Sequence, residues 1–106
     1  MGWVNDVLKG LKEGKKVTVR PFGGSMKGKI ESGQLVTLVP INFIDIKVED
    51  IVLVKWKGNY ILHLIKEIDN GKFLIGNNLG KVNGWVDGKD ILAKVIEVTD
   101  YKNYSA

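Results

Sequence analysis

The chain has 106 residues and carries 16 basic and 12 acidic side chains, giving a formal net charge of +4 with histidine neutral. This length predicts one domain, and the lack of cysteine excludes disulfides, a thiolate nucleophile and zinc–thiolate sites. With a single histidine and no carboxylates at metal-ligand spacing, neither a metal nor another cofactor is expected. No apolar run is long enough to span a membrane and none resembles a secretion signal, so a cytoplasmic chain is the default expectation.

The positive charge is scattered along the sequence. Its densest cluster is Lys12, Lys15, Lys16 and Arg20, and no long basic block follows. Strand aromatics that could stack on bases are few. We therefore expect no nucleic-acid partner, and a basic β-barrel that binds nucleic acid is the weakest of the functional hypotheses.

Residues 2–12 have the period of a helix. One apolar stripe is formed by Trp3, Val4, Val7, Leu8 and Leu11, and polar residues take the other side. This pattern predicts a short N-terminal helix that covers one face of a sheet. The alternative is a helix that makes a peripheral contact with a membrane surface.

After the helix the apolar period changes from 3.6 to 2. The predicted strands are 16–20, 35–39, 51–56, 60–68, 72–75 and 91–98. Residues 76–90 contain four glycines and are predicted to be a long irregular loop, and 99–106 a frayed tail. The sequence thus predicts one domain over 1–106, with a β-domain over 16–98. Its fold class is mostly β: a small, partly closed, antiparallel barrel-like fold with one short helix.

Gly58-Asn59 suits the two-residue turn of a hairpin, and Asp69-Asn70-Gly71 marks a second tight turn. If Gly58 and Asn59 form the first turn, Lys57 pairs with Tyr60, Trp56 with Ile61 and Val54 with His63. His63 then shares a strand face with Ile61, Ile65, Val54 and Trp56. A lone histidine on such a face is commonly a hydrogen-bonded core residue, unless a serine lies close to it.

A candidate serine exists. Ser25 follows Gly23-Gly24, and a serine on such a tight turn can expose its hydroxyl. A serine hydroxyl is a poor nucleophile until a base takes its proton. His63, the chain's only histidine, could be that base, and the pair would form a hydrolase dyad.

Five short boxes occur in one order over about residues 20–98. They read Ser25-Met26-Lys27-Gly28-Lys29-Ile30-Glu31-Ser32-Gly33-Gln34, Glu49-Asp50-Ile51-Val52, His63-Leu64, Gly76-Asn77-Asn78 and Ala93-Lys94-Val95. This order resembles the signal peptidase and LexA-type repressor group of serine peptidases. A histidine at the position of the base resembles the archaeal and endoplasmic-reticulum subtype of signal peptidases.

The resemblance implies the roles of the site residues. Ser25 would be the nucleophile and His63 the base, and backbone N–H groups of Gly24 and Ser25 would form the oxyanion hole. Met26 would line a side-chain pocket beside the cleft. The family places an aspartate about two dozen residues after the base, where the candidates are Asn77, Asn83, Asp87 and Asp90; charge favours Asp87.

The chain departs from the family pattern at four positions: Gly28 replaces a proline, Gln34 an aspartate, Leu64 an arginine and Asn77 an aspartate. Two functional hypotheses therefore stand. The first is a serine endopeptidase of signal-peptidase-like type, acting on a peptide or protein that binds as an added strand. The second is a catalytically inactive peptidase-like fold that acts as a peptide-binding or assembly module.

Overall fold

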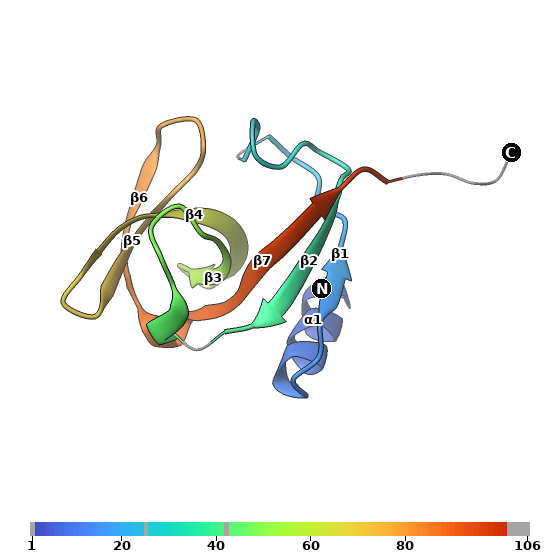
Figure 1. The fold of residues 1–106 in the computed structure, drawn as a ribbon, viewed down its shortest axis with the longest axis horizontal. Helices are drawn as coiled ribbons and strands as arrows, with labels where there is room; N and C mark the ends of the chain where they lie inside the picture. Colours follow the sequence, from blue (N-terminus) through green and yellow to red (C-terminus); the bar gives the residue numbers. More distant parts are fainter. Residues whose placement is uncertain (1, 25, 42, 102–106) are drawn as a thin grey trace, which may run out of the picture.

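The structure, a computed structural model of the chain, describes residues 2–24, 26–41 and 43–101. It consists of one antiparallel sheet of seven strands and one α-helix (Figure 1). The elements are α1 (Gly2–Lys12), β1 (Val17–Val19), β2 (Leu35–Pro40), β3 (Ile51–Trp56), β4 (Asn59–Asp69), β5 (Lys72–Gly76), β6 (Val82–Asp87) and β7 (Ile91–Thr99), with 3₁₀ turns at Phe43–Asp45 and Gly88–Asp90.

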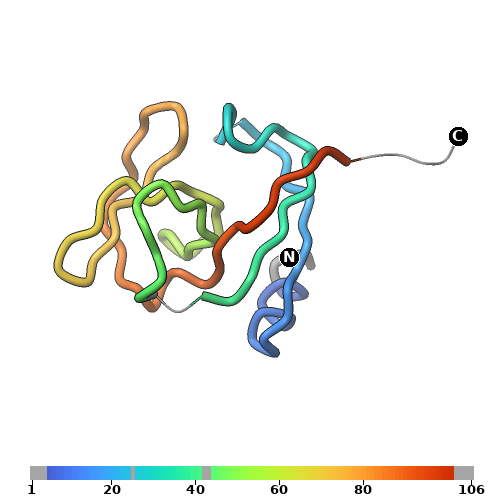
Figure 2. Tube along the Cα trace, viewed as in Figure 1, coloured from blue at the N-terminus to red at the C-terminus, as the bar shows by residue number. Residues whose placement is uncertain are grey.

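The sheet is curled but open. Its strand order is β1-β2-β7-β3-β4-β5-β6, and within the described residues no pairing joins β1 to β6. The trace in Figure 2 shows β3 to β6 curling at one end, with α1 beside β1 and β2 at the other. The expected mostly antiparallel β-fold with one short helix is confirmed, whereas the sheet is not closed into a barrel.

Helix α1 packs on one face of the sheet. Val7 is 2% exposed and Leu11 is 7% exposed, while Asn5, Asp6 and Lys9 face solvent. The two apolar side chains join the helix-side core, whose buried members are Val7, Leu11, Met26, Ile30, Val36, Leu38, Leu53, Leu64 and Ala93. Val7 and Leu11 of the predicted apolar stripe therefore cover the sheet, as the sequence predicts, while the side chains of Trp3 and Val4 lie outside the described part of the chain.

The opposite face carries a second core. We call it the far-side core, and its buried members are Ile46, Val52, Val54, Ile65, Phe73, Ile75, Val86 and Ile91. Strand β3 serves both cores because successive side chains point to opposite faces: Leu53 enters one, and Val52 and Val54 enter the other. All three are fully buried, so β3 is the centre of the molecule.

The first hairpin turn lies one residue earlier than predicted. Lys57 and Gly58 have φ values of 49° and 82° and form the turn, so Trp56 pairs with Asn59 and His63 pairs with Val52 instead of Val54. The register differs from the predicted one by two residues. A shift of two keeps every side chain on its face, so His63 still shares a face with Ile61 and Ile65. The second turn, at Asn70-Gly71, is confirmed.

Strand β6 was not predicted, because residues 76–90 were expected to form a loop. It pairs with β5 from Lys72↔Asp87 to Gly76↔Val82, with a bulge on the way. Gly84 lies inside it at φ 155°, and a Cβ there would come within 2.8 Å of the Trp56 ring. Glycine at this position allows the indole to pack against the strand backbone, and such close approach is one of the uses of glycine in a strand.

Candidate active site

The first half of β4 has a free edge. The Ile65 N–H donates to the Asp50 carbonyl at 2.9 Å, and the Ile65 carbonyl accepts from the Glu49 N–H at 2.8 Å, so the peptide groups of Ile65 face the β3 side. Alternation along an antiparallel strand turns those of Tyr60 and Leu62 to the other side. Strand β5 covers that side only from Leu64 onward. Within the described residues, no strand pairs with β4 there over residues 59–63.

A cavity of about 220 Å³ lies along this free edge. One wall is the strand itself, with Tyr60, Ile61, Leu62 and His63. The other wall comes from the segment between β1 and β2, and its lining residues are Pro21, Phe22, Gly23, Met26, Ile30 and Glu31. The cavity thus brings His63 to the segment that carries the candidate serine.

His63 is oriented by its own backbone. It is 8% exposed, and its Nδ1 is hydrogen-bonded to the Leu62 carbonyl. A carbonyl oxygen can only accept, so Nδ1 carries the proton and Nε2 has the free lone pair. This is the tautomer in which Nε2 can accept a proton from a hydroxyl.

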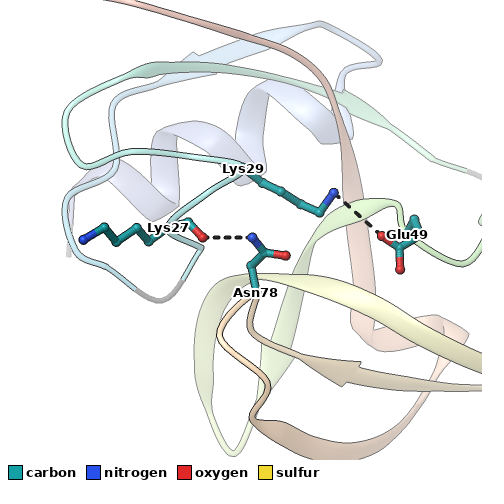
Figure 3. A network of polar contacts seen from close by, with 4 residues as sticks. All are labelled: Lys27, Lys29, Glu49 and Asn78. Atoms are coloured by element: carbon teal, nitrogen blue, oxygen red, sulfur yellow. Dashed lines mark hydrogen bonds and ion pairs between the residues drawn. The ribbon is translucent and has the colours of Figure 1, made fainter.

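The segment 20–34 is held against the sheet by polar contacts (Figure 3). The side-chain amide of Asn78, in the β5–β6 connection, donates to the Lys27 carbonyl at 2.8 Å, and Lys29 lies 3.7 Å from Glu49. Gly28 sits under this contact at φ 99°, and a Cβ there would be 2.7 Å from the Asn78 amide nitrogen. Proline cannot adopt this φ, whereas glycine adopts it without strain.

Ser25 lies outside the described residues, and its two neighbours are described. Met26 is 4% exposed, lines the cavity and belongs to the helix-side core. Gly24 is exposed, does not line the cavity, and accepts the Lys27 N–H through its carbonyl at 3.1 Å. Apart from its chain neighbours, no described residue has an atom within 4 Å of a Cβ added at Gly24.

Asp87 does not lie beside His63. On β6, Asp87 lies opposite Lys72 of β5, which lies opposite Asp69 of β4. Leu64, the neighbour of His63 on β4, is aligned across β5 with Val82 of β6. Five residues along the strand separate the two levels, roughly 16 Å at about 3.3 Å a residue. The Asp87 carboxylate forms an ion pair with Lys72, and this contact, with a smaller contribution from Lys89, lowers its pKa. The strand register therefore places Asp87 beside Lys72 and away from His63.

The other three candidates for the third position also form no hydrogen bond with His63, although Oδ1 of Asn83 is buried and has no hydrogen-bond partner among the described residues. Asn77 follows Gly76, and its side-chain oxygen accepts the N–H groups of Leu79 and Lys81, both at 2.9 Å. Asn83 lies at the β6 bulge, and Asp90 in the 3₁₀ turn before β7. None of the three lines the cavity that contains His63.

Sequence reasoning did not select Leu62, Tyr60 or Glu31. The carbonyl that orients His63 is a backbone group, and no side-chain pattern reports it. Tyr60 lies three residues before His63 on a strand that the sequence predicts, so its position on that strand could have been derived from the sequence. Glu31 lies inside the first box of the pattern and could have been considered with it.

No protein-family model matches the chain, and no curated protein sequence is significantly similar to it. Within the described residues, no helix has both the length and the apolar character needed to cross a membrane.

Proposed function

We propose that the chain is a serine endopeptidase of signal-peptidase-like type, with Ser25 as nucleophile and His63 as general base. One observation carries the proposal: His63 lines one wall of a cavity whose other wall includes Gly23 and Met26, two described residues that flank position 25. The nearby Nδ1 contact favours the tautomer that the chemistry needs.

In the proposed reaction, the Ser25 hydroxyl attacks the carbonyl carbon of a bound peptide while Nε2 of His63 takes its proton. The resulting oxyanion accepts hydrogen bonds from backbone N–H groups near Gly24. The C–N bond then breaks, Nε2 returns the proton to the leaving amine, and a water molecule hydrolyses the acyl ester by the same route. The Leu62 carbonyl would hold the ring throughout, the task that an aspartate performs in a triad.

The free edge of β4 supports a peptide as the substrate. The peptide groups of Tyr60 and the N–H of Leu62 face the cavity, and an extended chain can hydrogen-bond to such groups as an added strand. A peptide bound there would run past the His63 ring, because this residue ends the uncovered stretch.

A fluorophosphonate probe tests the catalytic claim. We expect labelling of a single serine, identified as Ser25 by peptide mapping, and its loss in Ser25→Ala. His63→Gln should lower the labelling rate by about 100-fold or more, since a general base contributes roughly 10²–10⁴. Ser32→Ala, which removes another hydroxyl from the same segment, is the matched control and should still be labelled at Ser25.

An inactive peptide-binding module is the second candidate, favoured by the free strand edge and because, among the described residues, no carboxylate is hydrogen-bonded to or ion-paired with His63. A folded protein that resists the probe but binds extended peptides would support it. Labelling at Ser32, or labelling that survives Ser25→Ala, would refute the proposed nucleophile.

A further inference from the structure

The cavity beside His63 contains one carboxylate. Glu31 lines it, and the other lining residues are apolar or uncharged apart from the histidine. The Gly28 N–H donates to Oε2 of Glu31 at 2.9 Å, which fixes the side chain to its own turn. Oε1 is left for another donor, and among the described residues no cation forms an ion pair with Glu31.

A carboxylate in this position favours a positive ligand. Glu31 is an exposed residue, so an ion pair formed with it would be partly screened by solvent and would contribute modestly to affinity. Lys29, on the same segment as Glu31, forms an ion pair with Glu49 and does not line the cavity. A cation supplied by the ligand would therefore complete the charge of the site.

The rim of the cavity carries an exposed aromatic ring that is paired with an arginine of the chain. Phe22 lines the cavity and is 72% exposed, and the guanidinium of Arg20 lies 5.2 Å from its ring centroid. Arg20 itself lines a different cavity, between α1 and β1, and its Nε donates to the Gly33 carbonyl at 2.8 Å. Arg20 thus already occupies a cation–π position at the Phe22 ring, and selection of a cationic ligand rests on Glu31 instead.

From these contacts we propose that the cavity is a subsite for a lysine or arginine side chain of the bound peptide, and that Glu31 is the residue that selects it. The apolar stem of the side chain would lie between Met26 and Tyr60, and its charged end would reach Oε1. The inference rests on the proposed function only in taking a peptide as the ligand; it does not require that the peptide be cut.

The test measures binding in the full chain carrying Ser25→Ala, so that no peptide is consumed. The probes are pools of fluorescein-labelled, end-blocked hexapeptides in which one position is fixed in turn as arginine, norleucine or glutamate. We expect fluorescence anisotropy to show that one arginine pool binds about three- to tenfold more tightly than the matching norleucine pool, the range for a partly screened ion pair. The glutamate pool should bind most weakly.

Glu31→Gln separates charge from structure, because its amide oxygen can still accept the Gly28 N–H. We expect this variant to lose the preference for arginine while its affinity for the norleucine pool is unchanged. Glu67→Gln, an equal change of charge on an exposed part of β4 outside the cavity, should keep the preference.

Equal binding of the arginine and norleucine pools, an arginine preference that survives Glu31→Gln, or no binding of any pool would each overturn the inference. The proposed peptidase has its own readout, labelling of the wild-type chain. A chain that selects arginine through Glu31 but resists the probe would retain the subsite and lose the catalytic claim. A chain that is labelled at Ser25 but binds the arginine and norleucine pools equally would retain the catalytic claim and lose the subsite.

Discussion

At the scale of single residues, the site depends on how His63 is held. A backbone carbonyl fixes the ring as well as a carboxylate does, but it carries no charge and stabilises the imidazolium less. In the proposed site the Leu62 carbonyl would support a dyad, because the carboxylate that lines the cavity, Glu31, accepts the Gly28 N–H and has no recorded contact with His63.

Asp87→Asn tests this separation between site and scaffold. The contact with Lys72 lowers the pKa of Asp87 below its ordinary value of 3.8 in the folded chain. A carboxylate with a lowered folded pKa stabilises the fold above its unfolded pKa, and this contribution is lost as the pH falls through the folded value. We expect Asp87→Asn to flatten the loss of stability below about pH 4, measured by urea unfolding from about pH 2 to 6.

The same variant should leave the labelling of Ser25 unchanged at neutral pH. Lys72→Met is the matched control, because it removes the partner of Asp87 and should flatten the same part of the pH profile. A large loss of labelling in Asp87→Asn, with the fold intact, would return Asp87 to the site.

At the scale of elements, the segment 20–34 joins the two ends of the sheet. Arg20 stacks 3.7 Å from the ring centroid of Tyr101, and Gln34 donates to Asp100 at 2.8 Å, so both ends of the segment contact the chain after β7. Its middle contacts the β5–β6 connection through Asn78 and Lys27. These contacts fix the distance between the segment and the free edge of β4, and hence the width of the cavity.

Gly28→Ala is expected to loosen this segment, and Gly80→Ala is its matched control. The two glycines have nearly the same φ, 99° and 97°, but a Cβ at Gly28 would meet Asn78 at 2.7 Å, and one at Gly80 would meet no atom within 4 Å. Both variants should lose about 1–2 kcal/mol to backbone strain. Gly28→Ala should lose about 1 kcal/mol more, because Asn78 must give up its hydrogen bond to Lys27.

Urea unfolding measures the two losses of stability. Adding Asn78→Ala should remove most of the difference between them, since the displaced amide is then absent. Equal losses in the two glycine variants would show that the Asn78 contact contributes nothing to stability.

Strands with clear alternation were predictable from the sequence, and residues whose role depends on a distant neighbour were not. The β3 strand follows directly from Ile51–Trp56. Strand β6 was missed because its glycine makes room for Trp56, a contact that joins two hairpins. The first turn was misplaced because Lys57 adopts a positive φ, which lysine seldom does. A turn at Gly58-Asn59 would not have required this conformation of the lysine. Asp87 was chosen by charge and spacing, and the register of β5 and β6 decides its true partner.

At the scale of the whole molecule, the two cores share strands β3, β4 and β7, each of which has buried residues in both. Because β3 places Leu53 in the helix-side core and Val52 in the far-side core, neither core can lose its packing without disturbing the other. The molecule should therefore unfold in a single transition, as small single domains usually do.

Leu53→Ala and Ile65→Ala test this coupling from the two sides of the sheet. Each removes a fully buried side chain, and we expect each to cost about 2–5 kcal/mol. In both variants, urea transitions followed by far-UV circular dichroism and by tryptophan fluorescence should stay superimposed. Separate transitions in either variant would show that the two cores unfold independently.

The free edge of β4 has a further consequence for self-association. Exposed strand edges are where folded β-proteins recruit further copies and grow into aggregates. Here the uncovered stretch is confined to residues 59–63 and faces the segment 21–31 across a small cavity. One extended chain can enter that space, but the segment keeps the sheet of a second molecule from pairing with β4. Pairing between copies would instead be expected at the outer edges of β1 and β6, where the sheet is open.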